Sequence, residues 1–192
     1  IYENLENACR AHGGTLANIV KTNTYMTDRS YYQAAFKAQM ERYGPDLPTN
    51  TGILWAGVYE PDWIFEIEGV AYLDTPIVRL NPDKIWDLWG SSHVTVKAGN
   101  TLYISGQVSA DEHGNVVGEG DVQAQLDQIY KNLDIACRAH GGTLADIVKT
   151  NTYMTDMSCY DPVLKTKKEV FGPNLPTSTG ILIPGLAKPE WL

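Results

Sequence analysis

Hydrophobic and polar residues follow two different periods along the chain, and both appear near its start. Apolar residues over 1–13 recur at helical spacing, and Gly13-Gly14 then supplies the left-handed stop at which helices commonly end. Residues 18–27 alternate in the manner of a strand rich in β-branched side chains. A second helix is predicted from Ser30, as its N-cap, to Tyr43, where Gly44-Pro45 ends it.

Strand-like alternation dominates the next part of the chain. Residues 50–58 and 63–72 are predicted to be strands. Within the second of these, Glu66 and Glu68 alternate with apolar residues, so one face of the strand carries two carboxylates. Residues 73–87 are interrupted by prolines, and we expect them to form an interdomain linker.

The remaining part of the chain begins with new strands and then repeats the earlier pattern. Asp121 is placed to cap a long amphipathic helix. Ala124 stands where a capping box needs Glu or Gln, so we expect a single cap. The other elements predicted here are strands at 94–96, 101–108, 116–117, 146–155 and 178–183, and a helix at 159–171.

An internal repeat underlies this pattern. Residues 8–28 and 136–156 differ at one position, Asn18 against Asp146, and the match extends without gaps to 1–64 against 129–192. We call these two segments the first copy and the second copy. Because residues 65–128 occur once, we expect similar segments before Ile1 and a strand like 65–72 after Leu192. The alternative is that the halves complement each other within or between chains.

One complete unit reads β-β-β-α-β-α-β-β, with two helices on one face of a mixed sheet. This order predicts an α+β two-layer sandwich, present as about one and a half repeats. The predicted domains are 1–72, the C-terminal part of a first domain, and 88–192, a second domain without its last strand, joined by the linker 73–87. Because a bare apolar sheet face would be a large exposed patch, we expect a homo-oligomer.

Composition narrows the classes of partner. The net charge of −8 argues against nucleic acid, whose binding depends on Lys and Arg contacts to phosphates. The one dense basic cluster, Lys165, Lys167 and Lys168, is expected to be a solvated helix face. No apolar run approaches the roughly 20 residues of a membrane span. The three cysteines have neither disulfide nor metal spacing, which favours reduced thiols and a cytoplasmic location.

Several short motifs are spread over nearly the whole chain. They are Leu-Tyr-Ile-Ser-Gly-Gln at 102–107, Gly-Gly-x-Leu-x-Asp-Ile-Val-Lys-Thr at 141–150, Met-Thr-Asp at 154–156, Leu-Pro-Thr at 175–177, and Phe-Glu-Ile-Glu-Gly-Val-Ala at 65–71. In these motifs the sequence resembles the RidA/YjgF family of reactive-intermediate deaminases. The resemblance implies a chorismate-mutase-like sandwich assembled as a trimer, or as a six-domain assembly of three tandem chains. It also implies hydrolysis of a small enamine or imine in a cleft between subunits, without metal or organic cofactor.

The resemblance further implies where the site lies and how it departs from the family. Deaminating members carry a Pro-Ala-Arg motif whose Arg clamps the substrate carboxylate. This chain has Asn50 and Ser178 at the matching positions, and Ser92 where the family has a pocket Tyr. Glu66 matches the family's acid that positions or activates the attacking water. The alternative is that Glu66 is a solvated strand residue.

Other polar and aromatic residues are expected around the same cleft. Aromatic residues at its entry would suit a conjugated ligand, although Trp86 and Trp89 could instead pack between domains. The expected substrate-binding residues, besides Asn50, Ser92 and Ser178, are Thr51, Thr179, Ser105, Trp89 and His93.

Three functions compete at this point. The first is a hydrolase acting on a C–N bond of an enamine, imine or aminated ring-cleavage product, which the retained Glu66 favours. The second is a ligand-binding or assembly protein without catalysis, which the absence of Arg at both matching positions favours. The third is an endoribonuclease, which the acidic charge disfavours. Neither a Ser-His-Asp order nor a metal-binding constellation is present in the sequence.

Overall fold

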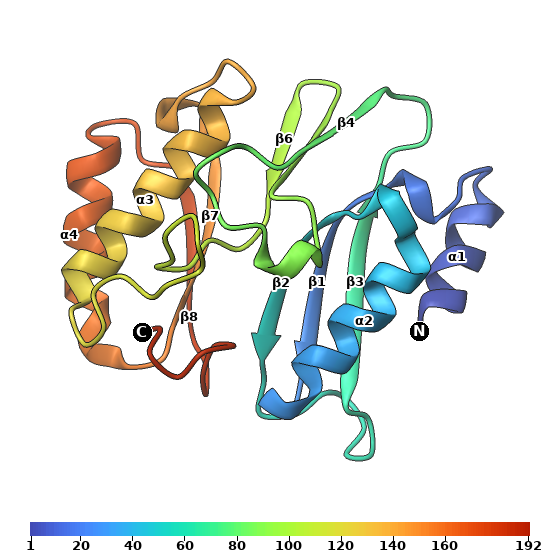
Figure 1. Ribbon diagram of the computed structural model, residues 1–192, viewed down its shortest axis with the longest axis horizontal. Coiled ribbons are helices and arrows are strands. Elements are labelled where there is room, and N and C mark those ends of the chain that lie inside the picture. Colours follow the sequence, from blue (N-terminus) through green and yellow to red (C-terminus); the bar gives the residue numbers. More distant parts are fainter. The chain divides into compact units, whose positions relative to one another are not determined.

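The chain divides into two compact units in the computed structural model, which describes residues 1–192 (Figure 1). The first unit contains Ile1–Asn81 and Asp87–Gly106, and the second contains Pro82–Trp86 and Gln107–Leu192. Together they hold four α-helices and mixed β-structure, as an α+β fold requires.

Two small sheets and two helices make up the first unit. The helices are α1 (Tyr2–Ala11) and α2 (Tyr32–Tyr43), and α2 lies across one face of a sheet ordered β2-β1-β3 (Figure 1). In that sheet β1 is parallel to β2 and antiparallel to β3. The second sheet is antiparallel and ordered β4-β5-β6. The strands are β1 (Ile19–Met26), β2 (Thr49–Leu54), β3 (Phe65–Ala71), β4 (Ile77–Leu80), β5 (Thr95–Ala98) and β6 (Thr101–Ile104).

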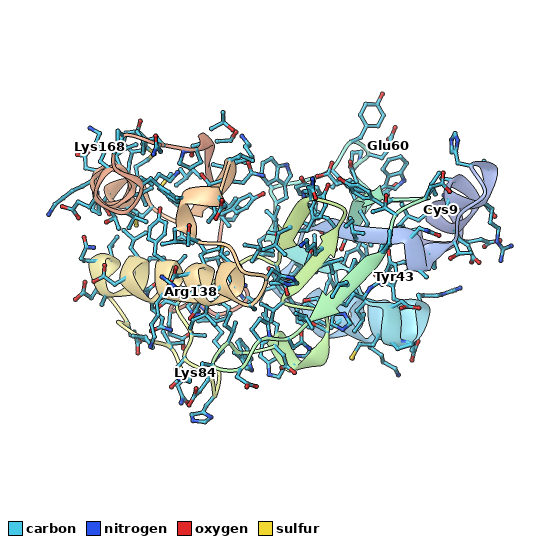
Figure 2. All side chains as sticks on the ribbon, turned by 90° about the horizontal axis from the view of Figure 1, so that it is seen from above. Cys9, Tyr43, Glu60, Lys84, Arg138 and Lys168 are labelled. Atoms are coloured by element: carbon cyan, nitrogen blue, oxygen red, sulfur yellow. The ribbon has the colours of Figure 1, made fainter.

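Burial of apolar residues on both faces of β1 holds the first unit together. Ile19 packs with Cys9 and Tyr43 from the helices, the latter two being labelled in Figure 2. Val20 packs with Val96 and Ala98 of β5. The strand β1 is therefore central, since a sheet neighbour lies on each edge and packed side chains lie on each face.

Local capping chemistry sets the ends of the elements. Gly44 follows α2 with φ of 56°, a left-handed conformation that glycine adopts without strain. Asp28, rather than the predicted Ser30, caps the turn before α2, because its carboxylate accepts the backbone N–H of Ser30 at 2.7 Å. Asp121 accepts only the N–H of Ala124 at 3.1 Å, which confirms the predicted single cap.

The sheet of the second unit has fewer strands than either sheet of the first unit. Helices α3 (Val122–Arg138) and α4 (Tyr160–Phe171) accompany a parallel pair of strands, β7 (Lys149–Met154) and β8 (Thr177–Leu182). Its core includes Leu126, Tyr130, Met154, Val163 and Phe171.

Several predicted elements differ from the structure. The expected linker 73–87 contains β4, because its apolar residues pair with β5. The strands predicted at 94–96 and 101–108 form the β5–β6 hairpin of the first unit. The second of these strands ends at Ile104, and the Gly106 N–H, two residues further on, donates to the Asn50 carbonyl. The pair 116–117 gives only an isolated bridge between Val116 and Ala110. The boundaries of the two compact units therefore differ from those of the repeat. The domains 1–72 and 88–192 were derived from the repeat and stay a prediction.

The basic cluster of α4 was predicted only in part. Lys165 and Lys168 are exposed, and Figure 2 labels Lys168 on this helix. Lys167, however, is 7% exposed. Because neighbouring residues of an α-helix point in different directions, Lys167 faces β8 while Lys168 faces solvent. The prediction of a solvated face was therefore wrong for Lys167.

Candidate functional site

Four predicted site residues of the first unit meet where β2 approaches the end of β6. The Asn50 N–H donates to Ser105 Oγ at 2.9 Å, and Ser105 Oγ donates to the His93 carbonyl at 2.7 Å. Ser92 Oγ lies 3.4 Å from Ser105 Oγ. Asn50, Ser92 and Ser105 are all buried, so their hydrogen bonds stabilise the packing of the β5–β6 hairpin against β2.

The side chains of Asn50 and His93 also have internal partners. Asn50 Oδ1 accepts from the hydroxyls of Thr22 at 3.0 Å and Thr24 at 3.1 Å. His93 Nδ1 lies 2.8 Å from the Leu47 carbonyl, which can only accept, so Nδ1 carries the proton. Both side chains thus contribute to the packing of the first unit.

A polar row occupies the other face of β1 and its neighbours. Glu68 on β3 accepts from Asn23 Nδ2 at 2.6 Å and from Tyr25 Oη at 3.0 Å. Glu66 lies opposite Tyr25 in the strand register and is exposed. Lys21 Nζ donates to Thr51 Oγ1 at 2.7 Å. The row therefore combines two carboxylates, a phenol, an amide and an amine.

The Lys21 ammonium has the most perturbed environment in this row. Burial lowers its pKa from 10.5 to about 7, against an opposing effect of the Glu68 carboxylate. A second bond reaches from Nζ to the Ile104 carbonyl at 3.4 Å. An amine with this pKa exchanges its proton near neutral pH, as acid–base chemistry requires.

Sequence reasoning had singled out Glu66, Glu68 and Thr51 but missed Lys21, Asn23 and Tyr25. A signal for the missed residues was present in the alternation of 19–26, where every second position is polar and long enough to reach a neighbouring strand. What the alternation lacked was the register that places Asn23 opposite Glu68.

The aromatic candidates fall into different units. Trp89 is 48% exposed and lies with its ring 5.8 Å from that of Phe36, in the first unit. Trp86 belongs to the second unit, where the Lys188 ammonium lies 5.3 Å from its ring centroid and the Trp191 ring at 6.3 Å. They do not form one aromatic entry segment within either unit.

The predicted residues Ser178 and Thr179 lie on β8 of the second unit, and each accepts from a lysine. Lys167 Nζ is 2.5 Å from Ser178 Oγ, and Lys149 Nζ is 2.7 Å from Thr179 Oγ1. Burial lowers the pKa of Lys167, and the positive charge of Lys149 lowers it further. Unlike Asn50, Ser178 is exposed.

The chain contains neither a metal-binding cluster nor a membrane-spanning helix. Its His, Cys, Asp and Glu side chains form no group of three or more that could hold a metal ion. None of the helices combines the length and the apolar character needed to cross a bilayer.

Comparison with known proteins identifies the family. Residues 90–192, more than half of the chain, match the family model described as Endoribonuclease L-PSP. The chain belongs to this family. It is the RidA/YjgF family that the sequence motifs resemble, so membership is confirmed.

Individual relatives of the L-PSP family agree with this assignment. A RutC family protein of Pyrococcus horikoshii is 30% identical over 93 residues, which cover 48% of this chain and 74% of the relative. A protein of Dermatophagoides farinae named 2-iminobutanoate/2-iminopropanoate deaminase is 26% identical over 93 residues, covering 48% of this chain and 73% of the relative.

Solved structures of the family share the fold. RidA from the Antarctic bacterium Psychrobacter sp. PAMC 21119 is 30% identical, with a TM-score of 0.53 over 57% of this chain and 88% of that chain. A Rid family protein of unknown function from Yersinia pestis is 23% identical, with a TM-score of 0.57 over 61% of this chain and 93% of that chain. The second likeness concerns the fold alone.

Proposed function

We propose that this chain acts as a hydrolase on the C–N bond of a small enamine, imine or aminated ring-cleavage product, releasing a carbonyl compound and ammonia. Membership of the L-PSP family supports this reaction class, and so does a relative named 2-iminobutanoate/2-iminopropanoate deaminase. The observation that carries the proposal is the polar row of β1 and β3, because it holds carboxylates beside proton donors.

Within this row the two carboxylates have different tasks. Glu68 Oε1 accepts from both Asn23 and Tyr25, so this carboxylate is held in position. Glu66 lies on the same face opposite Tyr25 and is exposed, which leaves it accessible to a water molecule. We assign Glu66 as the base and Glu68 as the group that orders the row.

The proposed reaction needs one water and no cofactor. Glu66 accepts a proton as the water oxygen attacks the carbon of the protonated imine, to which an enamine first tautomerises, and a neutral tetrahedral carbinolamine forms. Glu66 then returns this proton to the nitrogen, and the C–N bond breaks as the carbinolamine hydroxyl gives its own proton to Glu66. The products are the carbonyl compound and ammonia, which takes that proton as ammonium and restores the Glu66 carboxylate. General acid–base groups contribute typically about 10²–10⁴-fold to such steps.

Ammonia release from a panel of enamines and imines tests this role. Glu66→Gln should reduce the rate about 10²–10⁴-fold and leave folding intact, because the amide keeps the shape but cannot take the proton. Glu60→Gln is the matched control, since Glu60 is an exposed glutamate between β2 and β3 and is labelled in Figure 2. Equal rates for the Glu66→Gln protein and the wild type would remove Glu66 from the mechanism.

A second candidate is a ligand-binding or assembly protein of the same fold that lacks catalysis. It is favoured by Asn50, whose side-chain oxygen is occupied by two threonines where deaminating members are expected to present an Arg. Absence of ammonia release across the whole panel, with ligand binding retained, would select this function. Ribonuclease activity is disfavoured by the net charge of −8.

The assembly and location belong to the same proposal. We expect a homo-oligomer, either a trimer or a pseudo-hexameric arrangement of domains, with the substrate pocket at a domain or subunit interface, and a cytoplasmic location. Light scattering of the intact protein checks the assembly, and a monomer would contradict it.

A further inference from the structure

The amine of Lys21 is enclosed by groups from three strands. The side chain starts from β1, and its Nζ donates to Thr51 Oγ1 of β2 at 2.7 Å and to the carbonyl of Ile104, at the end of β6, at 3.4 Å. None of the ion pairs of the chain includes this lysine. An enclosed ammonium without a paired carboxylate is costly, so these surroundings favour the neutral amine.

The hydrogen bonds at Nζ also match a neutral amine. An ammonium has three N–H groups to donate, whereas a neutral amine has two and keeps a lone pair. Thr51 Oγ1 and the Ile104 carbonyl accept from both N–H groups of the neutral form, so the lone pair is left for reaction. A desolvated lysine of this kind is the type of nucleophile that condenses with carbonyl compounds.

Charge around the amine comes from β3. Burial lowers the pKa of Lys21 to about 7, and the Glu68 carboxylate of β3 opposes this shift. The contacts from β2 and β6 are an uncharged hydroxyl and a backbone carbonyl. About half of the Lys21 side chains are therefore neutral at pH 7, whereas an ordinary exposed lysine is neutral in fewer than about one molecule in a thousand.

The neighbours of Lys21 suit the covalent step as well. The Thr51 hydroxyl lies beside the nitrogen, where it can pass a proton between the nitrogen and the oxygen of an adduct. The negative charge of Glu68 would stabilise the cationic form of a C=N bond at Nζ. Lys21 as a whole is half-buried, so part of its side chain stays in contact with solvent.

We propose that Lys21 binds small uncharged aldehydes covalently and reversibly, as a Schiff base. The Nζ lone pair forms a bond to the aldehyde carbon, and one N–H proton moves to the carbonyl oxygen, which gives a carbinolamine. The oxygen then leaves as water with both former N–H hydrogens, and a C=N bond to Nζ remains. Addition of water reverses these steps and releases the aldehyde.

The charges of the polar row determine which carbonyl compounds fit. Glu66 and Glu68 lie on the same face as Lys21, so an aldehyde that carries a carboxylate is repelled and an uncharged one is not. This reaction uses neither an enamine nor an imine as substrate. Its outcome is therefore separate from that of the proposed C–N hydrolysis.

Reductive trapping of the intact protein tests the site. Propanal forms the Schiff base, cyanoborohydride reduces it to a stable propylamine, and mass spectrometry of peptides locates the label. At pH 7 Lys21 should be labelled at least about tenfold faster than Lys37 of α2, whose side chain is 76% exposed. The ratio of the two rates should fall to within about threefold in urea, where the enclosure of Lys21 is lost.

A pH series checks the reason for this preference. Between pH 7 and 9 the neutral fraction of Lys21 can rise only about twofold, whereas that of an exposed lysine rises about tenfold per pH unit. The ratio of Lys21 to Lys37 labelling should therefore fall at least about tenfold over this range. Because both residues are measured in one sample, the effect of pH on the reductant cancels.

Variants in the two copies test the neighbours of the amine. Thr51→Val, which keeps the shape but removes the hydroxyl, should slow labelling of Lys21 at least about threefold. Thr179→Val, the same change at the counterpart in the second copy, should leave that rate within about twofold. Glyoxylate, which carries a carboxylate, should label Lys21 less favourably relative to Lys37 than propanal does, and Glu68→Gln should reduce this difference.

Three outcomes overturn the proposal: labelling of Lys21 no faster than that of Lys37 at pH 7, a rate ratio that persists in urea, or equal slowing by Thr51→Val and Thr179→Val. The same ratio of Lys21 to Lys37 labelling with propanal and with glyoxylate would overturn the assignment to uncharged aldehydes.

Discussion

The strands β1 and β7 have the same sequence over six residues, Lys-Thr-Asn-Thr-Tyr-Met, yet they occupy different environments. β1 has β2 and β3 on its two edges, and β7 is paired in its sheet with β8 alone. Thr22 and Thr24 are 1% and 2% exposed, while their counterparts Thr150 and Thr152 are half-buried. Identical local sequence therefore specifies the strand in both copies, and the neighbours decide what each side chain does.

The lysine at the start of this shared six-residue stretch shows the difference most clearly. Lys21 and Lys149 each donate to a threonine hydroxyl at 2.7 Å. Lys21 is enclosed near the Ile104 carbonyl of β6, and its pKa falls to about 7, whereas Lys149 is exposed. The same lysine–threonine hydrogen bond is thus made by an enclosed amine in the first copy and by a solvent-exposed amine in the second copy.

Paired truncations in the two copies should give clearly different losses of stability. Val20 is fully buried, and its counterpart Val148 is 78% exposed. Val20→Ala should lower the free energy of unfolding by about 2 kcal/mol, since it leaves a cavity against β5, while Val148→Ala should change it by less than about 0.5 kcal/mol. Urea denaturation measures both, and similar losses would mean that the two environments are alike.

A pH series distinguishes the two lysines. The pKa of Lys21 in the folded state, about 7, lies below its ordinary value of 10.5. Between these values the unfolded chain binds more protons, so stability should rise with pH by at most about 1.4 kcal/mol per pH unit. Below pH 7 the destabilisation is complete. Lys21→Met should remove this rise between pH 7 and 9.5, and Lys149→Met should preserve it.

The smallest effect is expected from exchanging the residues that distinguish the copies at the β2 and β8 position. Ser178→Asn should stabilise the second unit by about 1 kcal/mol, because its amide oxygen gives the Thr150 hydroxyl an acceptor. Asn50→Ser should destabilise the first unit by about 1 kcal/mol, since Thr22 and Thr24 lose their acceptor. Thermal unfolding measures both changes, and a destabilising Ser178→Asn would contradict the comparison.

Local patterns predicted the elements of this chain well. The helices and strands of both copies appear within a few residues of their expected bounds, because caps, glycine stops and alternation act over short distances. The family was also found correctly, since its motifs are local. The pairing of β4 with β5 was missed because it joins residues 77–80 to a segment that the repeat assigned elsewhere.

The candidate site could be predicted only in part for the same reason. Glu66 was found from a motif, but its neighbour Tyr25 depends on the register between β1 and β3. The burial of Lys167 was missed because a run of lysines suggests a solvated face, and only packing against β8 shows which of them turns inward. Side-chain partners across strands are set by tertiary structure, which a single sequence does not display.

The late position of the β5–β6 hairpin bears on synthesis. Val20 is covered by Val96 and Ala98, so a ribosome must add more than seventy further residues before this face of β1 can be buried. At 5–20 residues per second the nascent strand would wait about 4–15 s. Such a long separation between partners also raises contact order and slows folding. We therefore expect the emerging first copy to be a chaperone client until the hairpin leaves the exit tunnel.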